Sequence, residues 1–521
     1  MKQIYFTLLL AVMSLFTSQI ANAYDFEVDG ICYNLNTSDM TASVTYKDDN
    51  YGSYSGDIAI QSYVIYKGRK INISSIANKA FYKCENLSSI TMANGIREIG
   101  VGAFGNCTNL AQISIPQSVV TIHKQAFTNC TSLKTVVLPN TIRTIDEEAF
   151  CNCKNLSSVN IPDSVTIISK SLFRGCVNLS ELKLHNRIEI IGDEAFYDCK
   201  ALSEFIIPSS VKSVGVFALG RCKIQNLYIE DCENTLHCGG KYPGGINLGI
   251  SNDNDYNYVY VGRNISTIGS YETDHENGED IGIRAKQVVL GKYCTTTEIG
   301  TWHYKRWEYS NEKYGDLLLF SNRSKIDKVS ILNGNLSTSH NTHFNFGDFD
   351  SLYVDREEGF PLEGRNVKVI EVGSNIAYLY IPWGWDGRDY PLRKLILGSN
   401  IINFQHSYYL SHCEHLDSII SYVRNPYPIN PAVFSGRTYT NTVLIVPNNT
   451  ISKYMQTNGW KNFFDIQEMD EETTPIASAI LKEKKNIMGR YNASGLKLNS
   501  PQKGINIIKY SDGTTKKVII K

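Results

Sequence analysis

The sequence predicts a solenoid, a linear stack of similar coils built from short parallel β-strands and tight helical turns. A motif of the form Ala-Phe-x-x-Cys-x-x-Leu-x-x-(Ile/Val) returns every 23 residues, without insertion or deletion, from Ala80 to Cys222. A fixed period of this length is the signature of a repeat architecture. The chain of 521 residues also exceeds what one compact core usually holds, and linear stacking avoids that limit.

Each repeat predicts one strand, one turn at a proline and one tight helical turn. In the third copy Val136 and Leu138 alternate as strand residues, Pro139 turns the chain, and Ile142 and Ile145 point back inside. We expect the phenylalanine and the cysteine of each motif to lie in the core. These residues are Phe81, Cys84, Phe104, Cys107, Phe127, Cys130, Phe150, Cys153, Phe173, Cys176, Phe196 and Cys199.

The motif cysteines are expected to remain unpaired. Stacked coils hold their Cβ vectors parallel, which is poor geometry for a disulfide. We therefore predict a buried ladder of small apolar side chains from Cys84 to Cys222. Cys151 departs from the pattern, and we expect it to face outward.

The N-terminus predicts export. Met1-Lys2-Gln3 precedes an apolar run from Ile4 to Phe16, and Ala21-Asn22-Ala23 is a small-x-small cleavage site. This pattern is typical of a secretory signal peptide. The apolar run is too short for a membrane anchor, and no later run is long enough for one. Because 51 basic residues balance 52 acidic ones, no net field favours nucleic acid.

The period and the composition divide the rest of the chain. Insertions within its irregular half, at 231–257, 270–285 and 333–349, are rich in Gly, Asn, Asp, Ser and Tyr, so we expect surface loops. The predicted organisation is a signal peptide at 1–23, a β-rich N-terminal cap with an Asp-Gly hairpin at 24–65, regular repeats at 66–230, degenerate repeats at 231–430, a C-terminal cap with a buried tryptophan at 431–470, and a linker with a small antiparallel β-module at 471–521.

Two segments resemble known families. The run from Ile115-Pro116-Gln117-Ser118-Val119 to Leu133, and its counterpart from Ile161 to Leu179, resembles the BspA-like leucine-rich repeat. The resemblance implies a leucine-rich-repeat solenoid on a surface or secreted protein of a host-associated anaerobe, with adhesion as the class of function. The tail after Tyr491 is similar to the sorting domains of the type IX secretion pathway, which implies contact with secretion machinery; a plain β-module is the alternative.

No motif predicts catalysis, a cofactor or a metal site. In His412-Cys413-Glu414-His415 the cysteine occupies the buried repeat position, so the repeat explains it. Cys232, His237 and Cys238 could form a site, but a loop disulfide, or no role at all, is favoured. Glu147-Glu148 sits in an outer turn and reads as a solvated face rather than a hydrolase pair. We therefore do not expect an enzyme.

Recognition is better supported than catalysis. Trp383 and Trp385 lie on a Gly/Pro-bounded stretch, and Trp302 and Trp307 form a second aromatic group that could bind sugar rings or a protein. The alternative is that these tryptophans fill gaps between irregular coils. Asp255-Tyr256-Asn257-Tyr258 has the composition of a binding loop.

The combined prediction is an exported cell-surface binding protein without catalytic activity. Its partner would be a host matrix protein, a glycan or another cell surface. A carbohydrate-processing protein and a purely structural surface component remain as alternatives.

Overall fold

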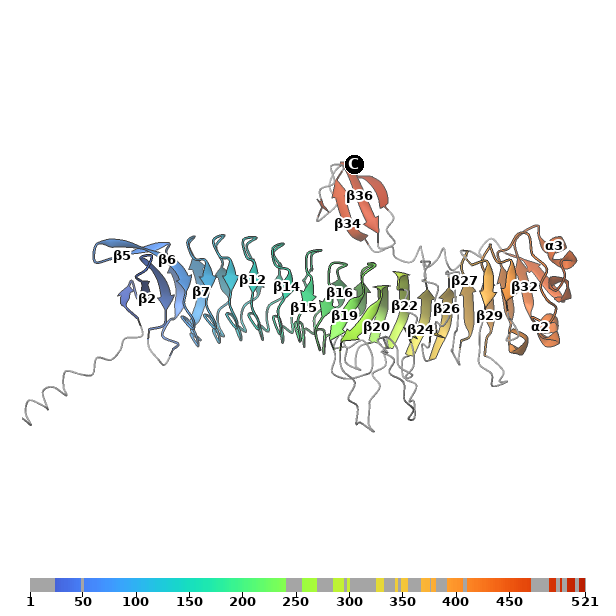
Figure 1. Cartoon of the computed structure of the whole chain (residues 1–521), viewed down its shortest axis with the longest axis horizontal. Coiled ribbons are helices and arrows are strands. Elements are labelled where there is room, and N and C mark those ends of the chain that lie inside the picture. The colour runs from blue at the N-terminus through green and yellow to red at the C-terminus, as the bar shows by residue number, and fades with distance from the viewer. Residues whose placement is uncertain are drawn as a thin grey trace, which may run out of the picture.

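A computed structural model shows an elongated stack of coils along one axis (Figure 1). The structure describes residues 24–47, 51–239, 255–268, 284–294, 298–299, 325–331, 343–344, 348–354, 367–374, 376–380, 391–405, 410–469, 487–492, 497–498, 504–510 and 515–520. The predicted signal peptide and most of the predicted linker lie outside these residues. The solenoid prediction is confirmed, because the repeat strands pair in parallel sheets.

Each coil contributes strands to two sides of the stack. On the first side the strands are β3 (Thr41–Thr45), β6 (Arg69–Ile76), β8 (Glu98–Ile99), β10 (Thr121–Ile122), β12 (Thr144–Ile145), β14 (Ile167–Ile168), β15 (Ile190–Ile191), β17 (Ser213–Val214), β19 (Leu236–Gly239) and β21 (Ile265–Ile268). Parallel pairs such as Thr121 with Thr144 join residues 23 apart, so the sequence period is the rise of one coil.

The second side ends in an eleven-stranded sheet, here named the long sheet, which runs from β16 to β33. It begins with β4 (Gly56–Ile60), β7 (Leu87–Met92), β9 (Gln112–Ser114), β11 (Thr135–Val136) and β13 (Ser158–Val159). The long sheet comprises β16 (Glu204–Ile207), β18 (Asn226–Ile229), β20 (Asp255–Arg263), β22 (Arg284–Tyr293), β24 (Lys325–Ile331), β26 (Asp348–Val354), β27 (Val369–Val372), β29 (Lys394–Leu397), β31 (Ser418–Ser421), β32 (Val443–Val446) and β33 (Asp465–Glu468).

A β-hairpin closes the N-terminal end. Strands β1 (Phe26–Val28) and β2 (Ile31–Asn36) are antiparallel, and the turn residues Asp29 and Gly30 have φ of 53° and 81°. Positive φ at both turn residues matches the twist of a two-residue hairpin. The hairpin expected around Asp-Gly is therefore confirmed. β2 then pairs with β3, which joins the first side of the stack, and β5 (Tyr63–Tyr66) pairs with β6.

Parallel phenylalanine rings run through the centre of the regular coils. Successive ring centroids are 5.0 to 5.8 Å apart and the ring planes differ by at most 12°. Tyr54 continues the stack before Phe81, and Phe205 meets Phe196 edge-on at 5.1 Å. The rings are Phe81, Phe104, Phe127, Phe150, Phe173 and Phe196, all with no exposed surface. Their predicted core position is confirmed.

The motif cysteines are buried and unpaired, as predicted, but they are more than apolar fillers. Each thiol from Cys107 to Cys222 donates to the carbonyl of the motif phenylalanine 26 residues earlier, with Sγ···O distances of 3.0 to 3.2 Å. The same carbonyl already accepts the amide three residues later, as Cys107 N does from Phe104 O. The thiol therefore joins consecutive coils through the one carbonyl lone pair that the turn leaves over.

The expected tight helical turn takes the form of consecutive hydrogen-bonded turns. Within 51–239, which the structure describes without a gap, no helix is present. Two left-handed residues recur in each turn segment, such as Gln125 and Asn129 with φ of 58°. They direct amides toward the next coil: Gln125 N donates to Glu147 O and Phe127 N to Ala149 O. A regular helix would bond these amides internally instead.

The prediction that Cys151 faces outward is wrong. Its exposed fraction is 7 %, and burial raises the pKa of its thiol. The equivalent positions of the flanking coils hold Thr128 and Arg174, which have larger side chains. A short side chain between two longer ones is shielded from solvent although its backbone position is on the surface.

The irregular half continues the same stack, and the predicted insertions were drawn too wide. Strand β19 lies inside 231–257, with Leu236 and Cys238 fully buried. Strand β20 begins at Asp255, where Tyr256 faces the core with 1 % exposure, so the expected loop of 255–258 is a strand. Strands β22, β25 (His343–Phe344) and β26 also begin inside the other two insertions. Alternation of large Tyr with Asn masked these strands in the composition.

Aromatic residues close the C-terminal end of the stack. Trp460 is 3 % exposed and its Nε1 donates to Tyr427 O at 2.9 Å. Phe434, Tyr439 and Phe463 pack around it. The buried tryptophan predicted for this cap is confirmed. The short helices here are η1 (Leu410–His412), α2 (Gly436–Asn441), α3 (Ile451–Gln456) and η2 (Trp460–Asn462), and the minor pairs are β23 (Glu298–Ile299) with β25, and β28 (Tyr378–Tyr380) with β30 (Asn403–Gln405).

The tail is a small antiparallel sheet, as its alternation predicts. Strand β36 (Gly504–Tyr510) pairs with β34 (Ile487–Asn492) on one side and β37 (Thr515–Ile520) on the other. Strand β35 (Lys497–Leu498) pairs with the free side of β34. The sheet is consistent with a sorting domain and with a plain β-module alike.

Candidate functional site

The outward face of the strands changes character where the long sheet begins. In the regular coils the outward positions carry short polar side chains such as Ser89, Gln112 and Thr135. On the long sheet the registered row of Ile206, Tyr228, Tyr260 and Val289 is aromatic and aliphatic. Alternation along each strand sets this face, because Leu227, Ile229, Val259 and Val261 point into the core.

Three tyrosines meet on this face, on strands β18 and β20. The rings of Tyr228 and Tyr258 lie 5.4 Å apart at 38°. The Tyr260 hydroxyl donates to the Asp231 carboxylate, 2.9 Å from each oxygen. Burial raises the pKa of both the Tyr258 and Tyr260 phenols, so they remain neutral donors at physiological pH. We call Tyr228, Tyr258, Tyr260 and Asp231 the tyrosine site.

Two glycines allow the coils at the tyrosine site to approach closely. A Cβ on Gly262 would lie 2.5 Å from Asp231 N and 2.7 Å from Glu230 C. A Cβ on Gly291 would lie 2.5 Å from the Tyr260 hydroxyl and 2.8 Å from Asp231 Oδ1. Because backbone cannot yield as a flexible side chain does, Gly262 is required for the position of Asp231, and Gly291 leaves room for its bond with Tyr260.

The tyrosine site was only partly visible in the sequence. Tyr258 was singled out, but as part of a loop, and Tyr228 and Tyr260 were missed. Strand-like alternation around Leu227 and Val259 was the available signal. The spacing of 32 residues between Tyr228 and Tyr260 breaks the period, so only the strand pairing places these side chains together.

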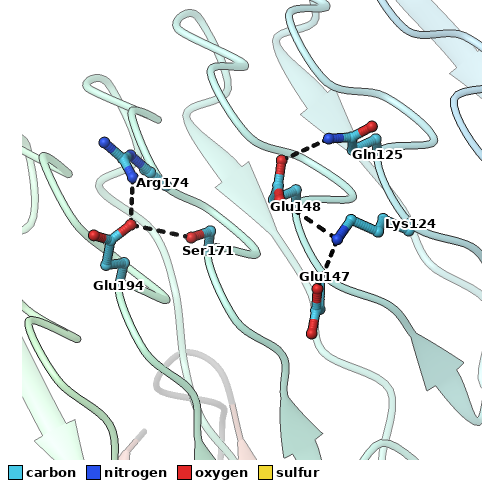
Figure 2. A network of polar contacts seen from close by, with 7 residues as sticks. All are labelled: Lys124, Gln125, Glu147, Glu148, Ser171, Arg174 and Glu194. Atoms are coloured by element: carbon cyan, nitrogen blue, oxygen red, sulfur yellow. Dashed lines mark hydrogen bonds and ion pairs between the residues drawn. The ribbon is translucent and has the colours of Figure 1, made fainter.

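A polar network crosses the turn segments of the regular coils (Figure 2). Lys124 Nζ lies 2.9 Å from Glu147 and 3.8 Å from Glu148, and Gln125 also donates to Glu148. One coil-pair further along, Glu194 accepts from Ser171 and Arg174. The carboxylates are partly exposed and paired across coils, so they form a solvated ladder of weak ion pairs. This arrangement agrees with the interpretation of Glu147-Glu148 as a solvated face.

The candidate thiol and histidine groupings do not form sites among the described residues. The predicted loop disulfide is wrong: Cys232 and Cys238 are both free, and Cys238 points into the core from β19. A strand residue that faces the core cannot reach a loop thiol. Cys413 is fully buried, as its repeat position predicts. No group of three His, Cys, Asp or Glu in the described part of the chain could hold a metal ion.

The predicted tryptophan sites lie outside the described residues. This applies to Trp302, Trp307, Trp383 and Trp385. Among the described residues, no helix has both the length and the apolar character to cross a membrane.

Comparison with known proteins identifies the repeats. Residues 54–180 and 166–238 match the family model described as BspA type leucine rich repeat region, in six copies. No curated protein matches the sequence.

Several solved structures are similar to this chain. A leucine-rich repeat protein of T. pallidum is 26% identical, covers 38% of this chain and 89% of its own, and has a TM-score of 0.34. A leucine rich cell surface protein from Faecalibacterium prausnitzii is 17% identical, covers 86% and 95%, and has a TM-score of 0.37. A leucine-rich repeat protein from Bacteroides ovatus is 21% identical, covers 86% and 100%, and has a TM-score of 0.40.

Proposed function

From residues 54–238, which make this chain a BspA-type leucine-rich-repeat protein, we propose that it is an exported cell-surface adhesin. Its partner is a host matrix protein, a glycan or another cell surface. Repeat proteins of this kind present long, continuous surfaces for binding. The catalytic groupings sought in the sequence have ordinary structural explanations where they fall within the described residues.

The tyrosine site is the observation that supports the proposal. Tyrosine combines a large apolar ring with a hydroxyl and loses little conformational entropy when it is buried at an interface. Here the rings of Tyr228 and Tyr258 pack together, and Asp231 orients the Tyr260 hydroxyl. A preorganised aromatic group of this kind lowers the entropic cost of binding. The four tryptophans Trp302, Trp307, Trp383 and Trp385 remain proposed as secondary contacts.

Export rests on the signal peptide at 1–23 and the tail at 471–521. Fractionation of the producing cells, with surface proteolysis of intact cells, tests it. We expect the full-length chain on the surface, a variant without 1–23 in the cytoplasm, and a variant without 471–521 retained before the surface. Surface display that survives loss of the tail contradicts the sorting proposal alone.

A binding screen of the mature chain from Tyr24 tests the adhesin proposal. Immobilised matrix proteins, glycans and bacterial surfaces are the probes, and saturable binding to one class is expected. Tyr258→Ser should weaken that binding at least about tenfold, which is ordinary for an interface aromatic. Tyr63→Ser is the matched control, because Tyr63 is 44% exposed on the distant cap strand β5.

The outcomes separate the function from its location. Binding unaffected by Tyr258→Ser but lost in the Trp383→Ala, Trp385→Ala double variant moves the contact to the tryptophans. Folded protein that binds none of the three classes contradicts the adhesin function and favours a structural surface component.

A further inference from the structure

A cluster of tyrosines and lysines lies at the N-terminal end of the turn segments. Tyr46 and Tyr51 come from the cap, and their ring centroids are 5.0 Å apart. Tyr82 comes from the first turn segment and meets Tyr51 edge-on at 5.5 Å. Lys79 Nζ lies 5.6 Å from the Tyr51 centroid and 5.8 Å from that of Tyr82, and Lys83 Nζ lies 5.6 Å from Tyr82.

The backbone holds this cluster in place. Lys79 and Lys83 are the two left-handed residues of their turn segment, with φ of 57° and 59°. Tyr82 O accepts the amide of Gly52, which fastens the cap to the turn. In the next coil a Cβ at Gly105 would lie 3.0 Å from the Tyr82 ring, so the ring rests against bare backbone. The cluster is therefore preorganised.

The charge of the cluster is not neutralised in the described part of the chain. Neither Lys79 nor Lys83 forms an ion pair there, and both side chains are exposed. Other cations of the turn segments do have carboxylate partners: Lys124 pairs with Glu147 and Arg174 with Glu194. Two exposed ammonium groups without such partners make a local positive patch on a chain that is almost neutral overall.

We propose that Tyr46, Tyr51, Lys79, Tyr82 and Lys83 bind an acidic saccharide, one that carries carboxylate or sulfate groups. The ammonium groups donate charge-assisted hydrogen bonds to the oxyanions. The phenol hydroxyls and ring edges contact the hydroxyls and the apolar faces of the sugar.

An acidic saccharide fits this cluster better than a peptide or a nucleic acid. Peptides commonly dock on a sheet edge or in an apolar groove, whereas the cluster sits on turns between coils. Nucleic acid binding draws on many phosphate contacts, and two lysines supply few. The cluster shares no residue or strand with the tyrosine site, so the two proposals stand or fall separately.

Binding of the mature chain to immobilised heparin and polygalacturonate, with neutral dextran as the blank, tests the proposal. Lys79→Gln with Lys83→Gln should weaken binding at least about tenfold, since each charge-assisted bond contributes substantially. The matched control is Lys124→Gln with Lys212→Gln, which removes two cations that already have carboxylate partners. The control should change binding less than about twofold. Binding should weaken as salt is added.

A second variant guards against misfolding. Tyr82→Phe keeps the ring and removes only the hydroxyl, so it should fold and still weaken binding; far-ultraviolet circular dichroism checks each variant. Equal loss in the control pair shows a general charge effect and overturns the site. No binding to either acidic polymer, or equal binding to polyglutamate, overturns the ligand class.

Discussion

Removal of one ring from the phenylalanine stack tests how the coils hold together. Phe127 has no exposed surface, and its ring lies 5.2 Å from both Phe104 and Phe150. Phe→Ala in a core costs about 3–5 kcal/mol, because transfer energy is lost and a cavity remains. Within that total, two aromatic pairs account for about 0.5–1.5 kcal/mol each. We expect Phe127→Ala to fall in this range.

Native-state hydrogen exchange is the suitable assay, because a solenoid opens locally rather than as one unit. The amides of Phe104 and residue 127 donate to Ala126 O and Ala149 O in the next coils. A loss of about 3 kcal/mol should accelerate their exchange roughly a hundredfold. Exchange near Trp460 should not change. Phe464→Ala is the control, since Phe464 is 82% exposed.

Two results would refute this reasoning. A loss below about 1 kcal/mol would mean that the ring stack adds little to coil stability. Uniform acceleration along the whole stack would mean that the chain opens as a single cooperative unit instead of by neighbouring coils.

Two further predictions concern the thiols and a glycine. In the native protein a small alkylating reagent should modify Cys232 first, because the other twelve cysteines are buried; mass spectrometry of digests checks this, and early labelling of Cys130 would contradict the ladder. Burial raises the pKa of Cys222 and Cys238 to about 12, from 9.0, so the folded state keeps protons that the unfolded state releases. Stability should be complete below pH 9 and decline as the pH rises toward 12; denaturant unfolding at several pH values measures it, and a flat profile opposes the burial. Gly262→Ala should displace Asp231 and weaken whatever binding Tyr258→Ser weakens, whereas Gly436→Ala, with nothing within 4 Å, should not.

Much of the fold could be predicted because the repeat reports its own packing. Phenylalanine, cysteine and leucine recur at one spacing, so a core position in one coil is a core position in every coil. The thiol bond to the phenylalanine carbonyl could not be predicted, because it joins residues 26 apart across two coils. The burial of Cys151 likewise depends on the size of its neighbours in the flanking coils.

The sequence by itself determined the solenoid, its period, its capped ends and the buried ladder, since these follow from local patterns that repeat without interruption. Only the tertiary structure decided what lies on the outward face. There Tyr228 and Tyr260 are 32 residues apart, and insertions separate the strands that bring them into register. Parallel pairing restores in space the order that the sequence loses along the chain, because backbone hydrogen bonds fix the register whatever the length of the loop between strands.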